Sequence, residues 1–218
     1  MVGSTLLRLR REFTRALLAG EAGAAERVVR AAMAGGLTAA QIDVELITPA
    51  LFMVGDKWAT GEISVAEEHL ASEIVLRVLA LHREAERAAL GRHRSRVLLL
   101  APEGERHVIG LQMTADLLYG AGYDVRMLGA DVPLGDIRPA ARRYAVDVVC
   151  FTATMAETAE QVDAAIDHLR SDGLDVGVVI GGTAVPFELG AAWGAKVCAD
   201  VSSAVECVDA LVQHAPHN

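Results

Sequence analysis

The hydrophobic pattern changes character at Gly91-Arg92-His93-Arg94-Ser95. Before this point, apolar residues recur every three or four positions, which is the spacing of amphipathic helices. The pattern predicts helices over residues 6–18, 23–34, 38–58 and 64–88. Because short connections favour antiparallel neighbours, residues 1–92 are predicted to form a four-helix bundle.

Polar residues mark several of the predicted helix ends. Thr38 followed by Gln41 is typical of a capping box, and Ser64 with Glu67 repeats that spacing before the last helix. Pro49 falls inside the third helix and is predicted to kink it, since proline lacks an amide hydrogen.

After the division, short apolar runs alternate with helical segments. The runs predict strands at residues 96–101, 123–128, 147–152, 176–180 and 195–198. The intervening segments predict helices at residues 107–120, 134–144, 156–171, 185–192 and 202–214. This alternation predicts an α/β domain over residues 93–218, with a five-stranded parallel sheet covered by helices on both faces. Ligands of such sheets bind outside the carboxyl ends of the strands.

Composition narrows the possible environments and partners. Apolar residues make up 52% of the 218 residues, but no uninterrupted apolar run approaches the ~20 residues that span a membrane. The first residues are amphipathic rather than typical of a signal peptide, so the expected location is cytoplasmic. Cys150, Cys198 and Cys207 show no CxxC spacing, and their odd number fits a reducing compartment. Cys150 is predicted to be a buried free thiol. A net charge of −9 disfavours independent binding to nucleic acid.

The first candidate for chemistry is the E-x-H-x-x-G pattern of Glu105, His107 and Gly110, which follows the first predicted strand. The imidazole can offer one nitrogen to a metal while the carboxylate takes the proton on the other, and Gly110 would let a bulky ligand approach closely. Taken alone, this pattern is better interpreted as an ordinary polar loop. The motifs downstream change that interpretation.

The pattern resembles the D-x-H-x-x-G motif of cobalamin-binding domains, with Glu105 in place of the usual Asp. The family's second motif, a Ser- or Thr-rich turn after the third strand, reads Thr152-Ala153-Thr154 here. Its third motif, a Gly-Gly pair after the fourth strand, reads Gly181-Gly182, and Gly129-Ala130-Asp131-Val132-Pro133 is similar to its loop after the second strand. The resemblance covers about residues 94–214 and implies a flavodoxin-like, Rossmann-type fold.

The resemblance also implies how a cofactor would be held. Cobalamin would bind with its own lower base displaced and with His107 as the metal ligand. Its nucleotide tail would enter a slot formed by Thr152, Thr154 and the backbone of Gly181 and Gly182. The neighbouring Arg106 and Thr183 complete the cofactor-binding residues predicted for this domain.

A second constellation lies in the helical half. Trp58 is followed after nine residues by Glu68-His69, and Val65 lies on the same helix face as that pair. A buried Trp beside a surface Glu-His pair is the ordinary alternative. Beside a cobalamin-type domain, however, the W-x9-EH pattern resembles the helical cap of cobalamin-dependent photoreceptor regulators. In that family the Trp covers the adenosyl group of adenosylcobalamin, and the Glu and His line the same pocket.

This second resemblance implies a light sensor, with Trp58, Val65, Glu68 and His69 above cobalt and His107 below. The sequence departs from the family in having no MerR-type DNA-binding segment and in carrying Ala59 where some members have a His after the Trp. The expected partner is therefore a regulatory protein or a further copy of the chain, without direct contact to nucleic acid.

Two other functions remain open. One is a corrinoid methyl carrier that serves separate methyltransferases, which shares the helical cap and the His ligand. The other is a flavodoxin-like domain that binds a mononucleotide or phosphate, although the chain lacks a glycine-rich phosphate loop. The W-x9-EH pattern favours the photoreceptor over the methyl carrier.

Overall fold

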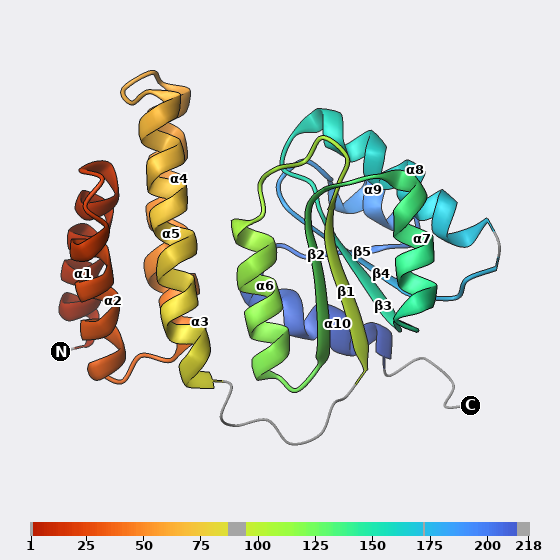
Figure 1. Cartoon of the computed structure of the whole chain (residues 1–218), viewed down its shortest axis with the longest axis horizontal. Coiled ribbons are helices and arrows are strands. Elements are labelled where there is room, and N and C mark those ends of the chain that lie inside the picture. The colour runs from red at the N-terminus through yellow and green to blue at the C-terminus, as the bar shows by residue number, and fades with distance from the viewer. Residues whose placement is uncertain (1, 87–94, 172, 213–218) are drawn as a thin grey trace. The chain divides into compact units, whose positions relative to one another are not determined.

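The computed structural model describes residues 2–86, 95–171 and 173–212, and the chain separates into two compact units (Figure 1). These units are Met1–Ala88 and Ala89–Asn218. The predicted domain boundary between residues 92 and 93 lies outside the described residues, as does the predicted helix end at Ala88. Among the described residues, no helix is both long enough and apolar enough to cross a membrane.

The first unit is helical, as predicted. Its elements are α1 (Val2–Leu18), α2 (Ala22–Ala34), α3 (Ala39–Ile42), a π-helical segment (Asp43–Ile47), α4 (Thr48–Ala59) and α5 (Val65–Glu86). Helix α1 contacts α2, α4 and α5, and the side chains of Phe13, Leu17, Val29, Val54 and Val75 are buried among them. The four-helix packing predicted from the periodicity therefore encloses a core of its own.

Both predicted helix starts are confirmed. The Thr38 hydroxyl accepts the amide hydrogen of Gln41, and the Gln41 side chain accepts the amide hydrogen of Thr38. Before α5, the amide nitrogen of Ser64 lies 2.7 Å from Oε2 of Glu67, and the amide of Glu67 donates to the Ser64 hydroxyl at 3.3 Å. These bonds satisfy amide groups that have no partner within their own helix.

The long helix predicted over residues 38–58 is instead interrupted by the π-helical segment just before Pro49. Pro49 has no N–H with which to reach the carbonyl of Glu45, four residues earlier. The Nε atom of Arg10 donates to that carbonyl at 2.8 Å. A side chain from α1 thus supplies a hydrogen bond that the proline cannot make, and the helix changes its winding just before Pro49.

The second unit is the predicted α/β domain. Its strands are β1 (Arg96–Pro102), β2 (Asp124–Val132), β3 (Val148–Thr152), β4 (Gly177–Gly181) and β5 (Lys196–Val197). Its helices are α6 (Ile109–Gly120), α7 (Leu134–Arg143), α8 (Ala156–Arg170), α9 (Phe187–Ala192), the short 3₁₀ turn Val201–Ser203 and α10 (Ala204–Val212). All strand pairs are parallel, and the order β2-β1-β3-β4-β5 is that of the flavodoxin-like fold.

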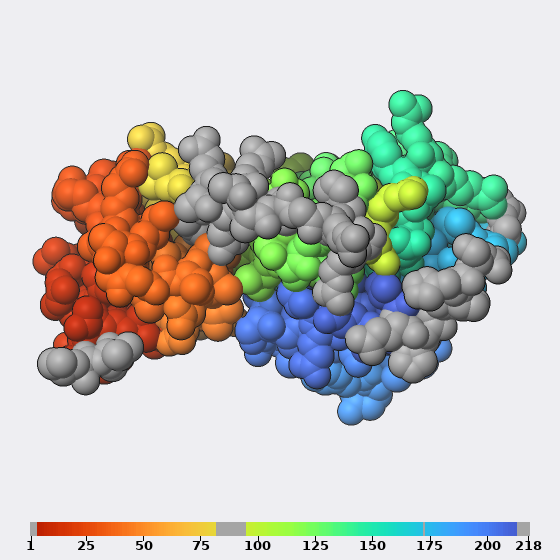
Figure 2. All heavy atoms as spheres, turned by 90° about the horizontal axis from the view of Figure 1, so that it is seen from below, coloured from red at the N-terminus to blue at the C-terminus, as the bar shows by residue number. Residues whose placement is uncertain are grey.

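Each face of the sheet is covered by its own helices. Alternate side chains of β1 point to opposite faces, so Leu98 and Leu100 pack with α7 and α8 while Val97 and Leu99 pack with α6 and α10. Helices α6 and α10 lie side by side on the latter face (Figure 1, Figure 2). Cys150 is buried there as predicted, and burial, with Cys207 nearby, raises the pKa of its thiol.

Two predicted boundaries near the strand ends are wrong. Helix α6 begins at Ile109 rather than at His107, because the Glu105 carboxylate accepts the amide hydrogen of His107 and holds that residue outside the helix. Strand β2 continues to Val132 instead of ending at residue 128. Its pairing with β1 shifts register twice, and Gly129 and Asp131 take positive φ angles at this irregular end.

Candidate functional site

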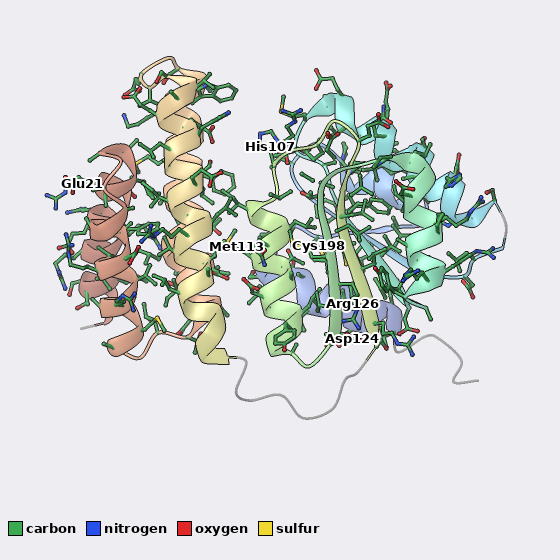
Figure 3. All side chains as sticks on the ribbon, viewed as in Figure 1. Glu21, His107, Met113, Asp124, Arg126 and Cys198 are labelled. Atoms are coloured by element: carbon green, nitrogen blue, oxygen red, sulfur yellow. The ribbon has the colours of Figure 1, made fainter. Side chains whose placement is uncertain are left out.

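The candidate ligand His107 lies on the loop between β1 and α6, at the carboxyl end of the sheet (Figure 3). Asp124 and Arg126 mark the opposite end, where β2 begins. Thr152, the last residue of β3, pairs with Gly181, the last residue of β4. The residues predicted from the three motifs of this unit therefore follow strands that end at one edge, where open α/β sheets bind ligands.

The Glu105 side chain joins several residues at this edge through hydrogen bonds. Its side chain is fully buried, and both oxygens of its carboxylate accept hydrogen bonds. Oε1 lies 2.6 Å from Nδ1 of His107 and 2.9 Å from that residue's amide nitrogen. Oε2 accepts the amide hydrogen of Thr154 at 2.6 Å and the Thr158 hydroxyl at 3.0 Å. One carboxylate thus ties the loop after β1 to the loop and helix after β3.

The electrostatics of Glu105 determine which nitrogen of His107 is available. Burial opposes ionisation of Glu105, but the hydrogen bonds from Thr154, His107 and Thr158 together hold its pKa below the usual value. An ionised carboxylate at 2.6 Å keeps the proton on Nδ1 of His107. The lone pair of Nε2 is then free to bind a metal, and the His107 side chain is 58% exposed.

This donor set fits a cobalt corrin. A corrin would supply most of the donors to its cobalt, so one imidazole with a free Nε2 would be enough as the protein's own ligand. The carboxylate behind Nδ1 orients the ring and raises its basicity, as residues behind metal-bound histidines commonly do. Among the described residues, no group of three or more His, Cys, Asp or Glu side chains could hold a metal ion by itself.

The glycines at this edge differ in whether the protein itself leaves room for a side chain. Gly182 has a φ of +95°, and a Cβ there would lie 2.1 Å from the carbonyl oxygen of Ala153, so the protein's own backbone demands glycine. A Cβ on Gly181 would make only an ordinary contact at 3.9 Å, and a Cβ on Gly110 would meet nothing within 4 Å. The prediction that a ligand needs these glycines therefore applies to Gly110 and Gly181, whereas Gly182 has a structural reason as well.

The remaining predicted residues of this unit occupy different environments. Thr152 is buried, whereas Arg106 and Thr183 are exposed. The Thr183 hydroxyl lies 3.5 Å from the carbonyl oxygen of Thr154, so the loops after β3 and β4 are adjacent.

Two residues that contribute to this edge were not predicted. Thr158 donates to Glu105 from the first turn of α8, and Asp131 accepts the amide hydrogen of Gly104 at 2.8 Å. The short pattern Thr154 to Thr158 carries no recognisable motif. Asp131 could have been found, because it lies in the Gly129–Pro133 stretch that resembles a family loop.

The predicted residues of the helical unit lie around one turn. Trp58 is in the last turn of α4 with 46% of its surface exposed, and Val65 begins α5 with 53% exposed. The alternative of a buried Trp58 is therefore wrong. Nδ1 of His69 lies 2.7 Å from Oε2 of Glu68, and the Ser72 hydroxyl donates to the other oxygen of Glu68 at 2.7 Å. In both units a carboxylate thus lies between a hydroxyl and an imidazole: Glu68 between Ser72 and His69, and Glu105 between Thr158 and His107.

Comparison with known proteins identifies relatives of two kinds. Residues 95–211 and, separately, residues 9–82 match family models described as a B12 binding domain. The HTH-type transcriptional repressor CarH of Myxococcus xanthus is 37% identical over 126 residues, which cover 58% of this chain and 41% of the repressor. The trimethylamine corrinoid protein of Methanosarcina barkeri is 26% identical over 182 residues, 81% of this chain and 82% of that protein.

The fold is also similar to that of a corrinoid protein. The structure of the monomethylamine corrinoid protein of Methanosarcina barkeri superimposes with a TM-score of 0.80 and 19% identity, over 93% of this chain and 97% of that one. At this identity the likeness concerns the fold alone. The match to residues 95–211 spans the sheet and the edge that carries Glu105 and His107. The chain therefore belongs to the B12 binding domain family and binds a cobalamin-type cofactor.

Proposed function

We propose that this chain binds adenosylcobalamin, with His107 as the lower metal ligand, and acts as a light-responsive regulator. The observation that carries the proposal is the half-exposed indole of Trp58 at the end of α4, together with the Glu68–His69 pair near the start of α5, in a chain whose other unit presents Nε2 of His107. An aromatic face exposed at a helix end gains free energy when it stacks on an adenosyl group. The 37% identity to the CarH repressor over 126 residues supports a regulatory role.

Each residue has a distinct part in this function. Glu105, held by Thr154 and Thr158, keeps His107 in the tautomer that binds metal. Trp58 contacts the upper adenosyl group, and Glu68 and His69 supply polar contacts to it. Thr152, Thr154 and the backbone at Gly181 and Gly182 accept the nucleotide tail.

When bound, the cofactor supplies a cobalt–carbon bond that visible light breaks. Without the adenosyl group Trp58 would lack that contact, and the populations of the chain's conformations would change, because a ligand that contacts one conformation shifts the population toward it. A protein partner or a changed oligomeric state reads this difference. The net charge of −9 favours protein over nucleic acid as that partner.

A second candidate function is that of a corrinoid methyl carrier. It is favoured by the length over which the chain is similar to a corrinoid protein. Similarity to the trimethylamine corrinoid protein covers 81% of this chain and 82% of that protein. In this function, His107 has the same role, and a partner methyltransferase replaces the regulatory partner. Trp58 would then have no large upper group to contact.

Illumination distinguishes the two functions. The full chain is loaded with adenosylcobalamin in darkness, and its visible spectrum and elution volume are recorded before and after seconds of green light. The light-sensor function requires a changed spectrum together with a changed elution volume, or with altered binding to a partner. Identical elution and partner binding in the two states, with tight retention of methylcobalamin, would contradict the light sensor and favour the methyl carrier.

A further inference from the structure

Asp131 is an exposed residue whose backbone conformation is unusual for any residue other than glycine. Its φ is +56°, in the left-handed region that non-glycine residues seldom occupy, and it lies near the end of edge strand β2. Aspartate tolerates this region better than most side chains, but the conformation still costs free energy. Non-glycine residues held in such conformations cluster at functional sites, where the surrounding structure maintains them.

Two hydrogen bonds join Asp131 to the loop that carries the candidate metal ligand. Its Oδ1 atom accepts the amide hydrogen of Gly104 at 2.8 Å, and its own amide donates to the carbonyl oxygen of Glu105 at 3.0 Å. Gly104 also has a positive φ, of +85°. The amide of Glu105 closes the same turn by donating to the carbonyl of Pro102 at 2.9 Å. The turn between β1 and His107 is thus held from the side by Asp131.

Glu105 is therefore restrained at both of its ends. Asp131 holds its backbone carbonyl, and Thr154 and Thr158 hold its carboxylate. The contact between Oε1 of Glu105 and Nδ1 of His107 depends on both restraints. If only the carboxylate oxygens were held, movement of the Glu105 backbone could still pull the carboxylate away from the imidazole.

We infer that Asp131 is a positioning residue for His107. Its acceptor fixes the Gly104–Glu105 turn, and the fixed turn keeps the Glu105 carboxylate on Nδ1 of His107, so that Nε2 stays available to a metal. The effect on the imidazole is a property of the protein alone. The effect on cobalamin affinity rests on the proposed role of His107.

Substitutions at one position separate the hydrogen bond from the backbone conformation. Asp131→Asn keeps an acceptor oxygen and tolerance of the left-handed region, whereas Asp131→Gly relaxes the backbone but removes the acceptor. Ala130→Gly is the matched control, since Ala130 is an exposed neighbour on the same strand end. All three are made in the full chain.

The primary readout is NMR of the cobalamin-free protein. In Asp131→Gly, the ratio of the Nδ1–H to the Nε2–H form of His107 should fall about 3- to 10-fold, the effect of losing one hydrogen bond. Exchange of the Gly104 amide should quicken by a similar factor. Asp131→Asn and Ala130→Gly should match the parent in both measurements, and the dissociation constant for adenosylcobalamin should rise about 3- to 10-fold only in Asp131→Gly.

An unchanged His107 tautomer ratio in Asp131→Gly would overturn the inference, whatever happens to cobalamin. A response of Asp131→Asn or Ala130→Gly equal to that of Asp131→Gly would also overturn it, because the acceptor would then not be the cause. If the ratio shifts as expected while even His107→Ala leaves cobalamin binding intact, the positioning role stands and the proposed function fails.

Discussion

Oε1 of Glu105 lies 2.6 Å from Nδ1 of His107, and the other oxygen of the same carboxylate is held by Thr154 and Thr158. A buried carboxylate with this set of donors is ionised at neutral pH and does not move easily, because each donor would lose its partner. The geometry gives His107 a preferred tautomer before any cofactor arrives. Such preorganisation reduces the free-energy cost of binding.

His107→Ala should weaken cobalamin binding or convert the visible spectrum to that of a cofactor without a protein ligand on its lower face. Because the His107 side chain is 58% exposed, the substitution should change the free energy of unfolding by less than about 1 kcal/mol. His168→Ala on α8 serves as the control and should keep the parent spectrum. An unaltered spectrum and affinity in His107→Ala would rule out His107 as the metal ligand.

Glu105→Gln should lower the free energy of unfolding by about 1–3 kcal/mol at neutral pH. The amide NH₂ of Gln cannot accept the hydrogens that one carboxylate oxygen now accepts, so buried donors lose their partners. Its effect on cobalamin binding should be milder than that of His107→Ala, since the imidazole remains. Chemical denaturation measures the first effect, and cofactor titration measures the second.

The unfolding free energies of the parent protein and Glu105→Gln should depend differently on pH. The pKa of Glu105 is lower in the folded chain than the ordinary glutamate value of about 4.3, so the unfolded chain binds the proton more readily. The resulting stabilisation is complete above that ordinary value and is lost as the pH falls through the folded pKa. The difference in unfolding free energy between parent and Glu105→Gln should therefore shrink below about pH 4. A constant difference from pH 7 to pH 3 would contradict this assignment.

Gly110→Ala and Gly182→Ala should separate ligand contact from folding. Gly182→Ala should cost about 2–4 kcal/mol of stability, because an added Cβ meets the Ala153 carbonyl and the φ of +95° disfavours alanine. Gly110→Ala lies in helix α6 with open space around it, so stability should stay constant or rise by up to about 1 kcal/mol. Cobalamin affinity should nevertheless fall in Gly110→Ala. Parent-like affinity in that variant would show that no ligand approaches this glycine.

Trp58→Ala should weaken binding of adenosylcobalamin more than binding of methylcobalamin. Loss of the stacking face is worth about 1–3 kcal/mol, and the methyl form has no adenosyl group to use it. Phe52→Ala is the matched control, since Phe52 is an exposed aromatic side chain on the same helix. Isothermal titration with both cofactors measures the difference. Equal losses for the two cofactors would mean that Trp58 does not recognise the upper ligand.

Periodicity and local spacing were enough to predict most of the architecture. The alternation of apolar runs and helical segments predicted the parallel sheet, and the capping boxes at Thr38 and Ser64 formed as expected. These features depend on residues within a few positions of one another, so their energetics are already present in the local chain. The Glu105–His107 pair belongs to the same class, because only two positions separate them.

Only the tertiary structure decided which residues distant in the sequence form hydrogen bonds with those local features. Thr158 reaches Glu105 from 53 positions away, Asp131 reaches Gly104 from 27, and Arg10 reaches the Glu45 carbonyl from 35. The requirement for glycine at position 182 comes from the backbone of Ala153 on a neighbouring loop. Contacts of this kind arise only when strands pair and helices pack, because their free energy depends on distances that folding creates. The sequence by itself therefore determined the elements and the ligand motif, while folding decided which distant groups hold that ligand in place.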